Sequence, residues 1–167
     1  MSDVVQVAIG LGSNLGDPLV QLAKACRAIQ CFPQSRWLAL SDAYVSSPQG
    51  PQDQPDFVNA VCLIETRLSA RSLLEHLQAV EAAQGRVKQR HWGERVIDLD
   101  ILLYGDAMIC ESDLTVPHAQ IAQRDFVLLP LAQLCPEVVI PSFGDIERLI
   151  SRLPMRFVTH SMPFMLD

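Results

Sequence analysis

Two aspartates, Asp98 and Asp100, alternate with apolar residues in segment 96–104 and form the strongest chemical signal in the chain. This alternation predicts a β-strand in which both aspartates share one face, with Cα atoms about 7 Å apart, while the apolar residues between them face the core. Carboxylates about 6 Å apart repel by about 3 kcal/mol at an effective dielectric constant of about 20, a cost that a hard divalent cation reverses. The pair therefore predicts a magnesium site, and the alternative is a solvated strand face.

A cluster of positive charge lies directly before these aspartates. Within ten positions the chain places four of its thirteen Lys and Arg residues, together with a histidine and a tryptophan: Arg86, Lys88, Arg90, His91, Trp92 and Arg95. Guanidinium groups match phosphate oxygens, metal ions bridge them, and an indole ring can lie on a base or close a site. Beside the two aspartates, the cluster favours nucleoside triphosphate binding, without a P-loop, over a solvated charged loop.

One carboxylate falls inside the apolar stripe of an expected helix. Residues 69–84 have helical spacing, with Ser69 as N-cap and Gly85 as the C-terminal stop. Glu81 projects within the stripe and Gln78 lies at its edge. Since a buried carboxylate needs a partner, we expect Glu81 to meet either an internal arginine or the hydroxyl groups of a ligand such as a ribose.

An aromatic residue and an amide share a face of another expected strand. Phe57 and Asn59 directly follow the polar, proline-rich segment 46–56, which is too long for a tight hairpin and is interpreted as a working loop. The pair would suit a planar heterocycle, and the alternative is a half-buried structural pair. His118 and Arg124 are further candidates for phosphate contacts, although a lone histidine after proline is more often structural.

The elements that carry these residues follow the order strand, helix, strand, strand, helix, strand. We expect strands at 4–11, 37–45, 57–66 and 96–104, main helices at 18–31 and 69–84, and shorter helical segments at about 124–134 and 146–153. This order predicts an α+β, ferredoxin-like fold: an antiparallel sheet with helices packed on one face and a C-terminal extension. A length of 167 residues suits one domain, 1–167.

Composition bounds the functional class. A net charge of -6 and a pI near 5.1 argue against sequence-independent binding to nucleic acid or to an anionic membrane. No run approaches the roughly 18 apolar residues of a spanning helix, and the start of the chain lacks signal-peptide features, so we expect a cytoplasmic protein. The five cysteines are odd in number and lack C-x-x-C spacing, as is typical of reduced thiols.

Four separated blocks carry more specific motifs. They are GSN at 12–14, GPQDQPDFVN at 50–59, RHWGERVIDLDI at 90–101 and VPH at 116–118. The most specific is the R-x-x-D-[LIV]-D run at 95–100, which follows Trp92 and Gly93. Together, over about residues 4–150, the blocks resemble the 6-hydroxymethyl-7,8-dihydropterin pyrophosphokinases of folate biosynthesis.

The resemblance implies transfer of the terminal diphosphate of ATP to the hydroxymethyl oxygen of the pterin, with release of AMP. It implies that Asp98 and Asp100 bind two magnesium ions, which hold the triphosphate and orient the attacking hydroxyl. It further implies that Arg86 and Arg95 stabilise charge on the transferred group and that Lys88 does similar work.

The resemblance also implies two sets of binding residues. Those around ATP are Gln78, Glu81, Arg86, Lys88, Trp92, Arg95, Ile101, Thr115, His118 and Arg124. Those around the pterin are Ser46, Ser47, Gln49, Phe57, Asn59, Trp92, Asp98 and Phe126, with the ring stacked between Phe57 and Phe126. On this basis Glu81 meets a ligand. We expect a monomer that binds these small molecules and neither nucleic acid nor membrane.

Two alternatives come from other functional classes. One is a non-catalytic, ferredoxin-like small-molecule-binding domain, which would not need Asp98 and Asp100 together with Arg95. The other is a metal-dependent nucleotidyl or glycosyl transferase that uses the Asp-x-Asp motif. Phe57 and Asn59 separate a pterin acceptor from a sugar acceptor only weakly, so that choice rests on the resemblance.

Overall fold

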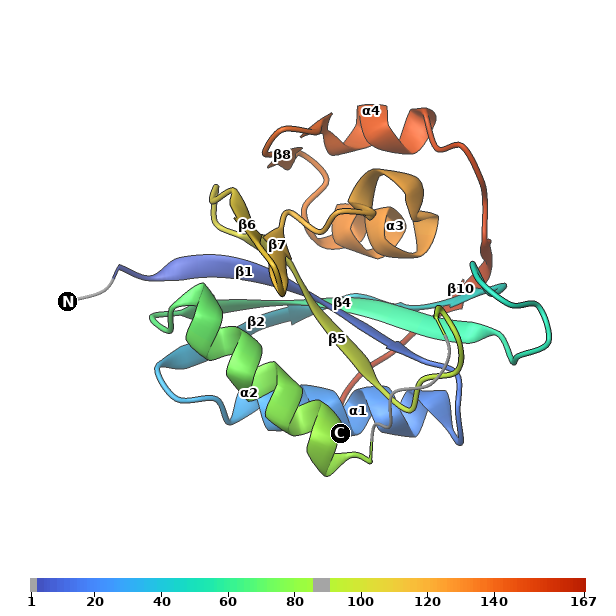
Figure 1. Cartoon of the computed structure of the whole chain (residues 1–167), viewed down its shortest axis with the longest axis horizontal. Helices are drawn as coiled ribbons and strands as arrows, with labels where there is room; N and C mark the ends of the chain where they lie inside the picture. The colour runs from blue at the N-terminus through green and yellow to red at the C-terminus, as the bar shows by residue number, and fades with distance from the viewer. Residues whose placement is uncertain (1–2, 86–90) are drawn as a thin grey trace.

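A six-stranded antiparallel sheet forms the middle layer of the molecule (Figure 1). The structure is a computed structural model that describes residues 3–85 and 91–167. The sheet strands are β1 (Val5–Ser13), β2 (Ser35–Leu40), β3 (Ala43–Ser46), β4 (Phe57–Thr66), β5 (Asp98–Tyr104) and β10 (Val158–Met162). Their order is β10-β3-β4-β1-β5, and β2 also pairs with β4. The order of the first four expected strands matches the ferredoxin-like prediction.

Helices cover both faces of this sheet. The helices are α1 (Pro18–Gln30), α2 (Ala70–Ala83), α3 (Asp125–Leu134) and α4 (Ile146–Ser151), with a short 3-10 helix, η1 (Ile121–Gln123), before α3. In Figure 1, α1 and α2 lie below the sheet, while α3 and α4 lie above it. Two short hairpins complete the described elements: β6 (Ile109–Glu111) with β7 (Leu114–Val116), and β8 (Val139–Ile140) with β9 (Gly144–Asp145).

Each face of the sheet buries its own core, as alternation along the strands requires. On β1, Val7 and Ile9 point into the core shared with α1 and α2, whereas Ala8 between them points into the core shared with α3 and α4. The C-terminal extension, expected beside a sheet with helices on one face, therefore closes the second face with α3 and α4. Because Asp98 and Asp100 alternate with residues of the first core, they lie on this second face.

Local signals in the sequence account for the ends of the two main helices. The Asp17 side chain accepts a hydrogen bond from the Val20 N–H at 3.4 Å, and Pro18 is the first residue of α1. Ser69 accepts one from the Ser72 N–H at 3.1 Å. The N-cap predictions are confirmed at both helices. In the ranges that the structure covers, no helix has the length and apolar character needed to cross a membrane.

The segment 37–45, expected as one strand, forms the two strands β2 and β3 instead. The break falls at Ser41, which is fully buried: its Oγ accepts a hydrogen bond from the Val61 N–H at 2.9 Å, and its own N–H donates to the Val61 carbonyl at 2.9 Å. A side chain thus replaces one backbone partner, so the ladder to β4 is interrupted there and resumes at Tyr44, opposite Asn59.

Candidate functional site

The site is built where three central strands lie side by side. Gly12 of β1 is the register partner of Asn59 on β4 and of Asp98 on β5, and Gly10 is the partner of Asp100. A Cβ at Gly12 would lie 2.6 Å from the Asn59 Oδ1, so only glycine lets the amide lie across β1. The register therefore brings the predicted amide and the predicted carboxylate pair to one place on the sheet.

The second face of β5 presents the two aspartates as the alternation predicts. The intervening Ile97, Leu99 and Ile101 are buried in the core toward α1 and α2, while both aspartates are half-buried. The predicted orientation is confirmed. Within the described ranges, no group of three or more His, Cys, Asp or Glu side chains is arranged to hold a metal ion. A cation here would therefore need oxygen ligands from a substrate or from water.

A pocket of about 550 Å³, including its open mouth, lies over the ends of β1, β4 and β5. Its lining contains all eight residues expected around the pterin: Ser46, Ser47, Gln49, Phe57, Asn59, Trp92, Asp98 and Phe126. They come from β3 and β4, the loop between them, the segment before β5, the first residue of β5, and the start of α3. Residues far apart in the chain are thus brought together, and their roles as pterin ligands stay a prediction.

Polar side chains of this pocket are held by one another. The Asn59 amide donates to the Ser46 Oγ at 3.3 Å, and the Arg124 Nε donates to the Gln49 Oε1 at 2.9 Å. The Arg124 guanidinium carbon lies 5.6 Å from the centre of the Phe126 ring, within cation–π range. Burial lowers the pKa of Arg124, opposed by the nearby carboxylates of Asp100 and Asp98, and the side chain remains a cation. Arg124 therefore brings positive charge to the wall nearest β5.

A second, smaller pocket adjoins the first along β5. Both aspartates line it, together with His118, Arg124 and Phe126, among others. Burial, and secondarily the charge of Arg124, lower the pKa of His118 to about 4, against the opposing effect of Asp98. His118 is therefore neutral at pH 7.

The hydrogen bond of His118 sets its tautomer. Its Nδ1 accepts from the Gln120 N–H at 3.2 Å, so the proton is assigned to Nε2, which faces the Asp100 Oδ2 at 4.0 Å. The histidine thus presents an N–H donor to the pocket beside a carboxylate.

A third pocket continues beyond Asp100, between α2 and the hairpin β6–β7. Three of the residues expected around ATP line it: Ile101, Thr115 and His118. Trp92, Arg95 and Arg124 line the first pocket instead. Gln78 is exposed on α2, and it and Glu81 lie outside the lining residues of all three pockets.

Glu81 has a partner that neither sequence alternative anticipated. It is buried within the apolar stripe of α2, as predicted, and its Oε2 accepts a hydrogen bond from the Leu99 N–H at 2.8 Å. The carboxylate thus fastens α2 to β5 midway between Asp98 and Asp100. Its contact with a nucleotide stays a prediction.

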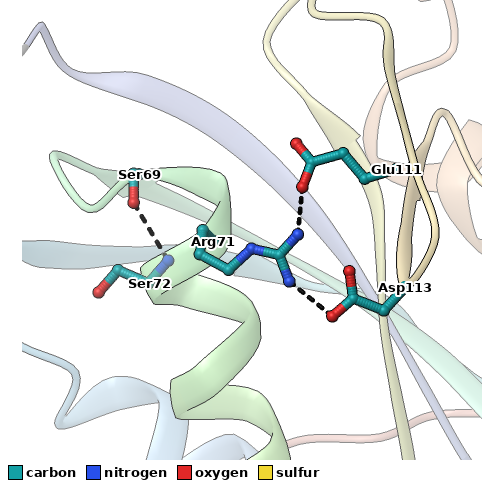
Figure 2. Close-up of polar contacts among 5 residues, drawn as sticks. All are labelled: Ser69, Arg71, Ser72, Glu111 and Asp113. Carbon is teal, nitrogen blue, oxygen red and sulfur yellow. Dashed lines mark hydrogen bonds and ion pairs between the residues drawn. The ribbon is translucent and has the colours of Figure 1, made fainter.

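Ion pairs join α2 to the hairpin that walls the third pocket. Figure 2 shows Arg71 of α2 directed between two carboxylates, pairing with Glu111 and, at 2.7 Å, with Asp113. Hydrogen bonds from the guanidinium lower the pKa of Asp113. Asp113 also lines the pocket, so these pairs hold one of its walls, although exposed pairs contribute little stability each.

Comparison with known proteins identifies the family. A family model for 7,8-dihydro-6-hydroxymethylpterin-pyrophosphokinase matches residues 8–136. The chain belongs to this pyrophosphokinase family. It is 45% identical over 159 residues to the 2-amino-4-hydroxy-6-hydroxymethyldihydropteridine pyrophosphokinase of Haemophilus influenzae, covering 95% of this chain and 97% of that one. It is 42% identical over 151 residues to that of Pseudomonas aeruginosa, covering 90% and 93%.

Solved structures support the fold. A Plasmodium falciparum HPPK-DHPS triple mutant with pteroate superposes with a TM-score of 0.72 at 14% identity, over 90% of this chain. The present chain spans 43% of that longer protein. The likeness at this identity concerns the fold alone, and it confirms the ferredoxin-like prediction.

Family membership confirms the resemblance inferred from the four sequence blocks. The chain is an ATP-dependent diphosphotransferase of folate biosynthesis, and its substrates are the small molecules ATP and a pterin. The two alternatives, a binding module and an Asp-x-Asp transferase, are not favoured.

Two buried amide side chains that hold the loops of the site together were not singled out in the sequence. Asn14 is buried, and its Nδ2 donates to the Gln54 Oε1 and the Pro55 carbonyl, both at 3.0 Å. Its Oδ1 accepts from the Arg95 N–H at 2.8 Å. Gln54 is also buried and donates to the Trp92 carbonyl at 2.9 Å. The two amides thus join the loop after β3 to the segment that carries Trp92 and Arg95.

The available signal was the composition of two motif blocks. Asn14 and Gln54 are amides inside the blocks 12–14 and 50–59, but periodicity assigns no side chain in a loop to the interior. Arg86 and Lys88, both expected at the phosphates, lie outside the described residues, and their roles stay predictions.

Proposed function

We propose that this pyrophosphokinase joins its two substrates at the carboxylate pair of β5. The terminal diphosphate of ATP is transferred to the hydroxymethyl oxygen of 6-hydroxymethyl-7,8-dihydropterin, and AMP is released. The observation that carries this assignment is the sharing of residues between pockets: Asp98 lines the first and second, and Asp100 lines the second and third. The pair therefore lies between the space suited to the pterin and the space suited to the nucleotide.

Asp98 and Asp100 fit a pair of magnesium ions. Their carboxylates share one half-exposed strand face, and magnesium is usually held by one or two protein carboxylates, with phosphate and water oxygens completing its shell. When bound there, magnesium would neutralise charge on the triphosphate. The number of two ions rests on the family resemblance.

Several side chains serve the phosphates in this proposal. His118 donates through its Nε2–H as a neutral group, and Arg124, which lines the same second pocket, supplies a cation. Arg95 lies on the segment held by Asn14, where it can meet the transferred group, and Arg86 and Lys88 complete the set. Transfer of this kind needs positioning and charge neutralisation more than a dedicated base.

The pterin occupies the first pocket. Phe57 from β4 and Phe126 from α3 offer aromatic rings to it, and the partly exposed Trp92 also lines it. Asn59 reads a polar edge of the ring, with its amide oriented by Ser46, while Ser47 and Gln49 supply further polar groups. A planar heterocycle with donors and acceptors along its edge matches this lining.

The base and ribose of ATP occupy the third pocket in this proposal. Ile101 and Thr115 line it, whereas contacts of Gln78 and Glu81 with the nucleotide rest on the family resemblance alone, because neither residue lines the pocket. We further propose that the whole chain, 1–167, acts as one domain and as a monomer in the cytoplasm. Its net charge of -6 supports the absence of nucleic-acid and membrane partners.

A product analysis tests this function. The purified protein is incubated with Mg-ATP and the pterin, beside reactions without pterin and without magnesium, and the nucleotides are separated. Pterin- and magnesium-dependent AMP together with an equal amount of pterin diphosphate is the expected result. Release of ADP would instead indicate a simple kinase, and AMP without pterin diphosphate would mean hydrolysis.

A further inference from the structure

A buried carboxylate at the start of α3 holds the C-terminal segment of the chain. Asp125 is 1% exposed, and its Oδ2 accepts hydrogen bonds from the Phe157 N–H at 2.8 Å and the Val158 N–H at 2.9 Å. Its Oδ1 is buried and has no hydrogen-bond partner within the described part of the chain. Because burying a carboxylate is costly, its two hydrogen bonds to consecutive backbone N–H groups indicate that Asp125 specifically attaches the C-terminal segment to α3.

This attachment fixes the position of Phe157, which contacts two residues that line the first pocket, Ser47 and Phe126. Its carbonyl accepts a hydrogen bond from the Ser47 N–H at 2.9 Å and from the Ser47 Oγ at 3.4 Å. Its ring meets the ring of Phe126 edge to face, with centres 5.9 Å apart and planes at 75°. Ser47 and Phe126 both line the pocket, whereas Phe157 is buried behind them and does not.

Beyond Val158, which is the register partner of the pocket residue Ser46, the tail pairs with residues that do not line the pocket. From Val158 to Met162, β10 extends the sheet along β3, and the Thr159 Oγ1 donates to the Val45 carbonyl at 3.2 Å. Among the described contacts of the tail, those that reach the pocket wall therefore lie at Phe157 and at the adjacent Val158, whose two N–H groups are the ones that Asp125 holds. A tail that only stabilised the sheet would not need a buried carboxylate at the residue next to Phe126.

We propose that Asp125 and Phe157 are positioning residues for the pterin: Asp125 anchors the tail, and Phe157 then sets the orientation of the Phe126 ring and of the loop at Ser47. The inference rests on the proposed role of this pocket as the pterin site. Edge-to-face contact restricts the rotation of Phe126, whose face the pterin needs. A pocket formed in advance also binds with a smaller ordering cost.

Pterin affinity and nucleotide affinity separate this role from simple stabilisation. For Phe157→Ala, we expect the Kd of the pterin, measured with a non-hydrolysable Mg-ATP analogue present, to rise by about five- to tenfold, the scale of one aromatic contact. The Kd of the analogue alone should change by less than about twofold, because the contacts described for Phe157, with Ser47, Phe126 and Asp125, involve no residue that lines the third pocket. Phe157→Leu, which keeps most of the buried volume, serves if the alanine variant fails to fold.

Two further variants isolate the anchor. Asp125→Ala removes both acceptors and should weaken the pterin as Phe157→Ala does, whereas Asp125→Asn keeps a carbonyl oxygen at the same place and should recover most of the affinity. Thr159→Val is the matched control, since it removes a tail contact that does not reach the pocket. It should leave the Kd of the pterin unchanged.

The outcomes distinguish the inference from the proposed function. Variants that lose thermal stability yet keep the pterin Kd of the Thr159→Val control would overturn the positioning role, as would equal losses of pterin and nucleotide affinity. Wild-type protein that forms no pterin diphosphate would instead overturn the proposed function. A selective loss of pterin affinity, restored by Asp125→Asn, supports the inference.

Discussion

Replacing Gly12 by alanine tests the central geometry of the site with a single methyl group. The added Cβ would lie 2.6 Å from the Asn59 Oδ1, whereas ordinary contact begins at 3.4 Å, so the amide must withdraw by about 0.8 Å. Because misplacement by about 1 Å can cost about 100-fold, we expect kcat/KM for the pterin to fall about 10- to 100-fold, or about 1.4 to 2.7 kcal/mol. Since Asn59 is half-buried and can move, the loss of stability should stay near 1 kcal/mol, the low end for overpacking.

The assay follows initial rates of AMP formation while one substrate is varied at saturation of the other. KM for ATP should change by less than about twofold, because Gly12 does not line the third pocket. Gly10→Ala is the matched control: the nearest atom to its Cβ would be a methyl group of Leu102 at 3.2 Å, so a shift of only about 0.2 Å would restore ordinary contact. It should therefore retain most of the pterin activity.

A double-mutant cycle decides whether the clash with Asn59 is the cause. Asn59→Ala alone should weaken the pterin, and Gly12→Ala should then add little, because the atom that it displaces is gone. Fully additive effects of the two substitutions would refute the reasoning, and so would a Gly12→Ala protein with the pterin kcat/KM of the wild type.

Three further predictions follow from other parts of the structure. Asp98→Ala should abolish product formation while leaving the thermal midpoint nearly unchanged, and a chelator added to wild-type protein should have the same effect; turnover retained in either case would contradict the metal assignment. Asn14→Ala should lower the free energy of unfolding by about 1 to 3 kcal/mol in urea titrations, because the Gln54 Oε1 and the Arg95 backbone N–H each lose their hydrogen bond to Asn14. A change below about 0.5 kcal/mol would refute the role of Asn14 in joining the two loops. Burial raises the pKa of Cys26 to about 12, so the thiolate fraction of this residue is negligible at about pH 8.5. Iodoacetamide should therefore label the exposed Cys31 and Cys110 first. Mass spectrometry that shows equal labelling of Cys26 in the folded protein would contradict this expectation.

Local chemistry explains what the sequence could predict of the fold. The caps of α1 and α2 depend on residues within three positions of each helix start, and the alternation in β4 and β5 depends on which side of a strand faces a core. The break at Ser41 escaped prediction because it depends on a bond to Val61, twenty positions away. The pairing of β10 escaped for the same reason, since its partner β3 lies more than a hundred positions away in the sequence.

The candidate site divides in a similar way. The family resemblance grouped eight residues that the structure brings together in the lining of the first pocket, although they lie far apart in the sequence, and their roles stay predictions. Asn14 and Gln54 were missed because a loop side chain shows no periodicity from which burial could be inferred. The hydrogen bond that Glu81 accepts from the Leu99 N–H was missed because every residue other than proline has a backbone N–H, so the residue type does not reveal such a partner.

The placement of α1 has a practical consequence for engineering this enzyme. Helix α1 packs on the face of the sheet away from Asp98 and Asp100 and contributes no residue to the three pockets described. Its outer surface includes Val20, a β-branched residue whose side chain is 46% exposed to solvent. Heat tolerance can therefore be improved by redesigning this surface with stronger helix formers, while turnover is left at its natural value.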